Sequence, residues 1–261
     1  MRRYWRDLWA YRELFAFLAW RDILVRYKQT VIGIAWAVLR PFLTMVVFTV
    51  IFGKLAKLPS EGVPYPVMVF AALLPWQFFA SAITDGSNAL LSNANMLTKV
   101  YFPRIIVPVS SIIVCLVDFL ASCVVLVGLM AWYRFLPGRQ VLLLPLFLML
   151  AIVASVGVSL WIAALNVRYR DFRYIVPFVV QFGLFISPVG FSSVVVPEQW
   201  RLIYALNPMV GAIDGFRWAV SGGTAHLDAR SMAVSAAVAV LLFLFGIRYF
   251  RKTESSFADI I

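Results

Sequence analysis

Long apolar runs separated by short charged breaks dominate this sequence. We identify six such runs, at residues 31–52, 66–91, 105–132, 141–165, 175–196 and 231–247. A helix needs about 20 predominantly apolar residues to cross a bilayer, and the first four runs reach that length without strain. The fifth run is broken by Pro177, Pro188 and Gly190, so we expect only part of it to span. The sequence therefore predicts an all-helical integral membrane protein with six transmembrane helices.

Composition supports this fold class. Hydrophobic residues make up 63% of the 261-residue chain and charged residues 13%, whereas soluble domains carry about 45–50% and about 25%. A soluble fold of this size could not bury so much apolar surface. An ordinary cytosolic enzyme, a disordered chain and a secreted disulfide scaffold are therefore excluded.

The basic residues fall unevenly between the two sides of the predicted membrane. Fifteen Lys and Arg residues lie in residues 1–30, 92–104, 166–174 and 248–261, and seven lie in the alternate loops. Because cytoplasmic loops are enriched in Lys and Arg, we expect both termini, including the tail 248–261, to be cytoplasmic. The formal charge of +11 thus indicates helix orientation in a membrane rather than nucleic-acid binding.

Residues 1–30 are expected to form a cytoplasmic amphipathic segment ahead of a single transmembrane domain at 31–261. Tyr4, Leu8, Tyr11 and Phe15 recur at helical spacing on one face, which suits a helix lying at the headgroup boundary. This helix is either a simple topology anchor or a docking element for a cytoplasmic partner.

The predicted cytoplasmic loop 92–104 carries apolar side chains, among them Met96, Leu97 and Tyr101. Water-exposed loops do not present such residues unless something covers them. The sequence predicts a short helix here, capped by Ser92 or Asn93. It either folds back onto the bilayer surface or inserts into a groove of a partner protein.

Residues 187–223 are too long for a simple connection. Pro197 starts one short helical stretch, and a second follows Asn207-Pro208 and stops at Gly222-Gly223. Each is too short to span, so we interpret residues 193–223 as re-entrant gate helices. The alternative is a pair of helices resting on the outer leaflet.

Three charges lie inside the predicted spans, where they are costly and usually face the bundle interior. We expect Arg40 and Asp118 to pair with each other or to line a hydrated path. Asp85 lies close enough to the cytoplasmic end of its run to reach the interface.

No catalytic constellation is present in the sequence. Gly53-Lys54 is followed by Leu55, so the phosphate-binding loop of nucleotide hydrolases is absent. His226 is the single histidine, and Cys115 and Cys123 are separated by eight positions of one helical run, beyond disulfide reach. We therefore expect neither enzymatic activity nor a metal site nor a cofactor in this chain.

Four segments carry a family resemblance. Residues 21–41, 47–53, 165–172 and 206–209 resemble, in order, the membrane subunits of polysaccharide ABC exporters. Within that family the pattern is most similar to O-antigen polysaccharide permeases, and capsule and teichoic-acid exporters are near neighbours.

The resemblance implies a homodimer that binds two copies of a separate ATPase subunit. That subunit would supply ATP and Mg, and the dimer would move a lipid-linked polysaccharide across the bacterial inner membrane. The resemblance also implies which residues contact the ATPase. They are Tyr4, Leu8, Tyr11, Asn95, Met96, Leu97, Lys99, Tyr101 and Arg104.

A polysaccharide path would run between the first and fifth spans of the dimer. Aromatic rings can pack against the C–H faces of sugars. Our candidates for the path are Trp36, Arg40, Phe42, Trp76, Phe79, Phe182 and Phe185, and those for the gate are Trp200, Tyr204, Asn207 and Pro208. A drug or small-lipid exporter of the same fold and a membrane-embedded glycan-modifying enzyme remain alternatives.

Overall fold

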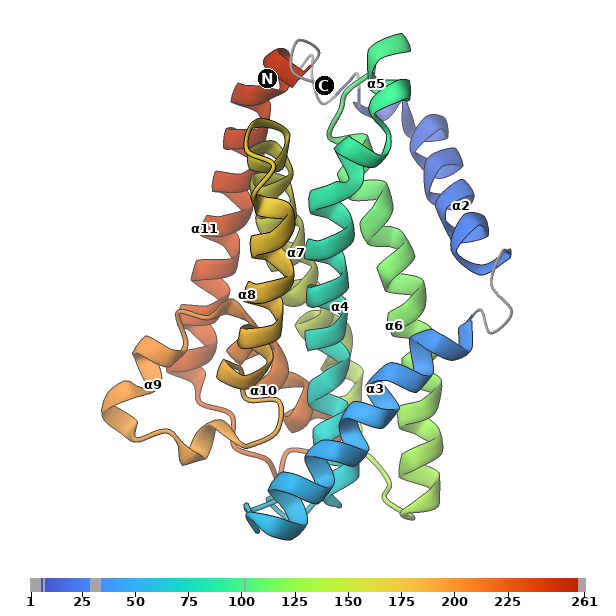
Figure 1. Ribbon diagram of the computed structural model, residues 1–261. Helices are drawn as coiled ribbons and strands as arrows, with labels where there is room; N and C mark the ends of the chain where they lie inside the picture. Colours follow the sequence, from blue (N-terminus) through green and yellow to red (C-terminus); the bar gives the residue numbers. More distant parts are fainter. Residues whose placement is uncertain (1–5, 7, 29–33, 101, 258–261) are drawn as a thin grey trace.

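The computed structural model describes residues 6, 8–28, 34–100 and 102–257 of the chain, and Figure 1 shows them as a bundle of helices. The described residues contain helices, turns and loops and no β-strand. We call the end of the bundle with α5 (Ala94–Lys99) the α5 end. The opposite end, with α9 (Glu198–Tyr204), is the α9 end.

Five helical segments of the described chain are long and apolar enough to cross a membrane. They confirm five of the six predicted runs: Ala35–Leu55, Tyr65–Ser92, Ile106–Trp132, Arg139–Arg168 and Ala229–Thr253. The first consists of α3 (Ile34–Phe48) and a π-helical stretch, η1 (Thr49–Leu55). The others are α4 (Tyr65–Ser92), α6 (Ile106–Trp132), α7 (Leu144–Arg168), preceded by η2 (Arg139–Leu143), and α11 (Ala229–Thr253).

The run predicted at 175–196 forms only a short helix. Helix α8 covers Phe172–Ile186, which is 15 residues or about 22 Å at 1.5 Å per residue. It ends at Ser187, because a residue before proline disfavours helical backbone and Pro188 cannot donate a hydrogen bond. The structure thus confirms that this run is interrupted and moves its helical part toward the α5 end.

The N-terminal helix differs from our prediction in what it contacts. Helix α2 (Arg12–Lys28) lies beside α6 and buries Leu18 and Ala19. The face that we expected at the bilayer surface, with Leu8, Tyr11 and Phe15, instead packs partly against a core cluster of the bundle itself. The exposed aromatic residues are Trp9, Phe17 and Trp20. Tyr4 lies outside the described residues.

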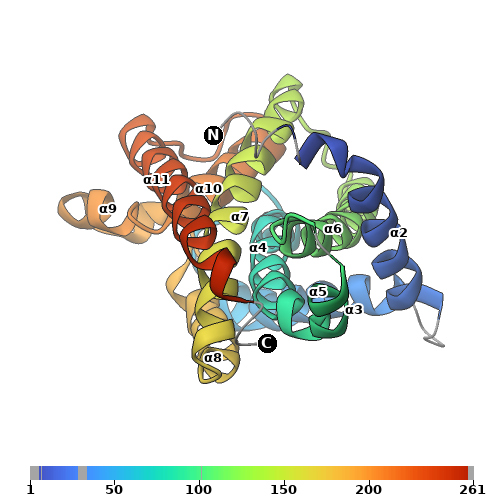
Figure 2. The same cartoon turned by 90° about the horizontal axis from the view of Figure 1, so that it is seen from above.

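Helix α4 is the central element. It packs against α6, α7 and α10 (Pro208–Val220) and lies in the middle of the bundle in Figure 2. Small residues allow helices of this bundle to approach one another closely, as is common between membrane helices. A Cβ on Gly246 of α11 would lie 2.1 Å from the carbonyl oxygen of Gly157 on α7. The Ser159 hydroxyl of α7 donates to the Ala82 carbonyl of α4 at 2.8 Å.

The two short helices predicted between 193 and 223 are present and occupy different environments. Helix α9 has no buried residue, whereas nearly every residue of α10 is buried among α4, α7 and α11. Asn207 caps α10 by accepting from the Met209 amide at 3.0 Å, and Gly222 and Gly223 follow it with positive φ. The alternative of two helices resting on the outer leaflet is wrong for α10.

The start of α11 depends on a carboxylate cap, which gives a first prediction. Asp228 accepts hydrogen bonds from the Ser231 hydroxyl at 2.6 Å and from the amides of Arg230 and Ser231. The Ser231 hydroxyl is the main reason why the pKa of Asp228 lies below its usual value. We expect Asp228→Ala to lower the free energy of unfolding by about 1 kcal/mol, as for other helix caps.

A denaturant titration in micelles would measure this loss, and Asp228→Asn is the matched control because asparagine caps helices equally well. Equal losses in both variants would contradict the capping role.

Candidate functional site

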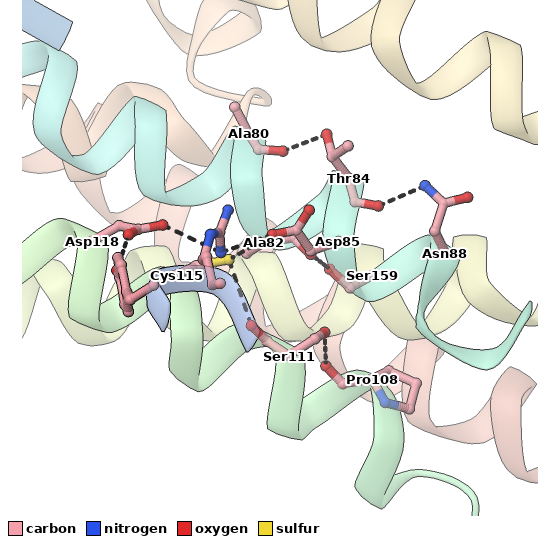
Figure 3. Close-up of polar contacts among 12 residues, drawn as sticks. Ala80, Ala82, Thr84, Asp85, Asn88, Pro108, Ser111, Cys115, Asp118 and Ser159 are labelled. Atoms are coloured by element: carbon pink, nitrogen blue, oxygen red, sulfur yellow. Dashed lines mark hydrogen bonds and ion pairs between the residues drawn. The ribbon is translucent and has the colours of Figure 1, made fainter. Parts of the chain in front are cut away.

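A cluster of charges joins three helices within the bundle. The Arg26 Nη1 atom of α2 lies 3.1 Å from Asp85 Oδ2 of α4 and 3.2 Å from Asp118 Oδ2 of α6. Tyr27, beside Arg26, donates its hydroxyl to Asp118. Figure 3 shows Asp85 and Asp118 facing each other across this site. We call Arg26, Tyr27, Asp85 and Asp118 the Arg26 cluster.

The Arg26 cluster corrects our prediction for the charges inside the spans. Asp118 pairs with Arg26, and no ion pair joins it to Arg40 among the described residues. Asp85 also pairs with Arg26. Cys115 lies beside the cluster, with its Sγ 3.5 Å from Asp85 Oδ2. The sequence does not reveal Arg26 as a partner, because it precedes the first apolar run and resembles any basic flanking residue.

A cavity of about 260 Å³ adjoins the Arg26 cluster. It lies among α2, α3, α4 and α6, and its lining combines Arg40 with the polar side chains of Gln77, Ser81 and Ser122. Trp36 also lines it. Our second possibility for Arg40 and Asp118 was that they line a hydrated path. Both residues line this cavity.

The seven predicted path residues lie in four places. Trp36 and Arg40 line the cavity beside the Arg26 cluster, and Phe42 lines a separate apolar pocket between α3 and α6. Trp76, Phe79 and Phe182 line an apolar groove of about 560 Å³ among α4, α7 and α8. Phe185 contacts Phe48 of α3, with ring centroids 6.1 Å apart.

Helices α3 and α8 meet at the α9 end. Besides the contact between Phe48 and Phe185, Gly190 fits against the ring of Phe52 so closely that a Cβ on it would lie 2.8 Å away. The Tyr65 hydroxyl donates to the Gly190 carbonyl at 2.5 Å. Toward the α5 end the two helices diverge (Figure 1).

The predicted gate residues connect α8, α9 and α10. The Tyr204 hydroxyl donates to the Ile186 carbonyl at 2.8 Å, and the side-chain amide of Asn207 donates to the Ser187 hydroxyl at 2.9 Å. Pro208 is the first residue of α10, and Trp200 is an exposed residue of α9. The gate segment is therefore fastened directly to the end of α8.

Arg217 was missed at the sequence level, where it counted as an ordinary loop charge. It lies on α10, is 4% exposed, and donates to the carbonyls of Phe191 at 2.5 Å and Val189 at 2.8 Å. A buried guanidinium thus holds the backbone that connects α8 to α9. The sequence signal that could have identified Arg217 is its position as an arginine within an apolar stretch. A guanidinium buried there needs several hydrogen-bond acceptors.

The loop predicted to dock an ATPase is partly covered by the protein's own core. Leu97 of α5 and the neighbouring Phe102 are buried with Leu18 of α2, whereas Asn95, Lys99 and Val100 are exposed. Asn93 begins α5 without a side-chain cap and instead accepts from Arg21 at 2.8 Å.

Two other residues of this predicted docking set have definite positions in the fold. Met96 is partly buried against the same core cluster. Arg104 donates to the backbone carbonyl of Glu254 at 2.5 Å, which ties the loop to the end of α11. Tyr101 lies outside the described residues.

Comparisons with known proteins identify the family. The family described as ABC-2 type transporter matches residues 13–220. The chain belongs to the ABC-2 type transporter family. It is therefore a multi-pass membrane permease subunit, and its long apolar helices are the transmembrane part of that permease.

Similar proteins export polysaccharides. The O-antigen export system permease protein RfbA of Myxococcus xanthus is 30% identical over 264 residues, covering 100% of both chains. A protein of the same description from Klebsiella pneumoniae is 27% identical over 250 residues, or 95% of each chain. The polysialic acid transport protein KpsM of Escherichia coli is 23% identical over 241 residues, or 90% of this chain and 92% of that protein.

The Arg26 cluster generates the second prediction. Removing one partner of an ion pair leaves the remaining charge without compensation. Since Arg26 and Asp85 keep about a third of their side-chain surface exposed, we expect Arg26→Leu to cost about 1–2 kcal/mol, less than the 3–5 kcal/mol of fully buried pairs. Thermal unfolding in detergent would measure the loss.

The triple variant Arg26→Leu, Asp85→Asn, Asp118→Asn should recover most of this stability, because no carboxylate is left unpaired. Lys28→Leu, at an exposed position of the same helix, is the matched control and should leave stability unchanged. If neutralising the carboxylates failed to rescue the Arg26 variant, the electrostatic explanation would be wrong.

Proposed function

We propose that this ABC-2 permease exports a lipid-linked polysaccharide of the O-antigen type across the bacterial inner membrane. The observation that carries this proposal is the similarity to an O-antigen export permease along the full length of both chains. The lower similarity to a polysialic acid transport protein makes a capsule polymer the second candidate. Both substrates are long polar chains that cannot cross hydrocarbon unaided.

The transport unit in this proposal is a homodimer with two copies of a separate ATPase. The α5 end is cytoplasmic, as are both termini, because the loops and segments at that end carry the excess of Lys and Arg. The ATPase binds there, around the exposed residues Asn95, Lys99 and Val100 of the α5 region. Nucleotide binding in that partner then biases the equilibrium between two arrangements of the dimer.

The space between α3 and α8 supports a path at the dimer interface. Both helices leave large apolar side chains uncovered in a single copy, including Trp36, Phe42 and Phe185. Phe48 of α3 and Phe185 of α8 contact each other at the α9 end, which we take as the outward-closed state of this path. In the dimer, separation of Phe48 and Phe185 would open the path outward.

The docking surface leads to a third prediction. We expect Lys99→Glu to reduce polysaccharide export at least several-fold at normal expression, because reversing an exposed charge disrupts complementarity with the partner. Met96→Asp should do the same with a stronger effect. Leu136→Asp, at an 89% exposed position in the loop at the α9 end, is the control and should export normally.

Surface polysaccharide on intact cells would be measured, together with co-purification of the ATPase. Normal export and normal co-purification by both α5 variants would show that the ATPase does not bind here.

The gate residues lead to a fourth prediction. Tyr204→Ala removes the hydrogen bond that fastens α9 to the end of α8, and we expect vesicles containing this variant to leak small solutes. Trp200→Ala should leak less, because its side chain is half exposed. Trp132→Ala serves as the control, because Trp132 is an exposed residue where α6 ends, at the α9 end of the bundle. Release of a trapped fluorophore measures the leak, and intact vesicles for Tyr204→Ala would argue against a gate.

A further inference from the structure

The loop that follows α5 is fastened to the end of α11 by two hydrogen bonds that run in opposite directions. The backbone amide of Arg104 donates to the Oε1 atom of Glu254 at 2.7 Å, and the Arg104 guanidinium donates to the backbone carbonyl of Glu254 at 2.5 Å. The two residues are 150 positions apart in the sequence. Each bond gives a partner to a backbone group at a helix end, where the helix itself supplies none.

The chain beyond α11 folds back onto the core at the α5 end. A short 3-10 turn, η4 (Glu254–Ser256), follows α11, and the next residue, Phe257, is 2% exposed. Its ring meets Phe250 of α11 edge to face, with centroids 5.4 Å apart. Phe257 belongs to the same buried cluster as Leu97 of α5 and Phe102. Polar and apolar contacts therefore both join the end of α11 to the α5 region.

Near its other end, α11 contacts the gate segment through one buried serine. The Ser235 hydroxyl donates to the Ala205 carbonyl at 2.9 Å and accepts from the Gly211 amide at 3.2 Å. Ala205 follows α9 directly, and Gly211 lies on α10. A Cβ on Gly211 would lie 2.7 Å from the Cβ of Ser235, so the backbone of α10 lies directly against this side chain. Ser235 thus joins α11 to both short helices.

Helix α11 is continuous between these two attachments. From Ser235 to Glu254 it extends over about 28 Å at 1.5 Å per residue. It contains no proline, and its glycine, Gly246, packs against Gly157 of α7. Sharp kinks in helices almost always coincide with proline or a similar interruption. A displacement of one end of α11 therefore reaches the other end.

We propose that α11 transmits movement of the docking loop to the gate segment, with Glu254 and Ser235 as its two positioning residues. A movement of the ATPase that displaces α5 acts on Glu254 through Arg104. Helix α11 then shifts along α7, and Ser235 carries the shift to α9 and α10. This inference rests on the proposed docking of an ATPase at α5, and it adds the route by which that docking controls the gate.

The attachment at Glu254 is tested without an ATPase or a polysaccharide, by hydrogen–deuterium exchange of the purified full-length permease in nanodiscs. Glu254→Ala should raise exchange in the segment from α5 to Arg104 several-fold, because the Arg104 amide loses its acceptor. Glu254→Gln should stay near the wild type, since its side-chain oxygen can still accept. Lys252→Ala, at an exposed position of the same turn, is the control. Unchanged exchange in Glu254→Ala would overturn the proposal.

Transmission is tested in the complex with the ATPase, as the amount of lipid-linked O-antigen polysaccharide exported per ATP hydrolysed. Glu254→Ala and Ser235→Ala should each lower this ratio by about fivefold or more, which is the lower end of couplings between distant sites. A variant that merely folds poorly gives less active complex and leaves the ratio unchanged. Ser155→Ala is the matched control, because that buried hydroxyl donates to Ala151 within its own helix.

The double variant Glu254→Ala, Ser235→Ala should lose no more than either single variant, because two breaks in one link are not additive. A wild-type ratio in both single variants overturns the proposal, and so does a double variant whose loss is the product of the two single losses. A wild-type chain that binds no ATPase or exports no polysaccharide contradicts the proposed function itself. Unchanged exchange or an unchanged ratio contradicts the role of α11 alone.

Discussion

Charges inside an apolar bundle must be compensated. In this protein Arg26 compensates the carboxylates of two helices at once. Its guanidinium lies within 3.2 Å of the carboxylates of Asp85 and Asp118, which would otherwise repel each other across α4 and α6. This interaction holds α2 along the side of the bundle. Through Leu18, α2 in turn helps to bury Leu97 and Phe102 at the α5 end, so the proposed ATPase surface depends on the same arginine.

A second buried arginine organises the opposite end. Arg217 on α10 binds the carbonyls of Val189 and Phe191, and Tyr65 binds the carbonyl between them, that of Gly190. Irregular backbone at membrane depth is stable only where the protein satisfies its polar groups. These donors therefore explain how the chain can leave α8 at Ser187-Pro188, turn, and enter the bundle again as α10.

Helix α8 separates two environments with different chemistry. Toward α3 it meets a second aromatic surface at Phe48, where the proposed sugar path is closed. Toward α4 and α7 it borders a groove with almost no polar group. Helix α8 is short and has a single buried residue, Val176.

The sequence by itself determined the fold class, five long spans, the interrupted run near Pro188 and the two short helices on either side of Asn207. These features follow from run length, proline chemistry and capping, which are local properties of the chain. Only the tertiary structure decided that Asp118 pairs with Arg26 and not with Arg40, that α10 is buried, and that Arg217 holds a loop. It also showed that three predicted path aromatics line an apolar groove. Partner choice between distant charges and the polarity of a groove depend on which helices pack together, and hydrophobic periodicity carries no information about that.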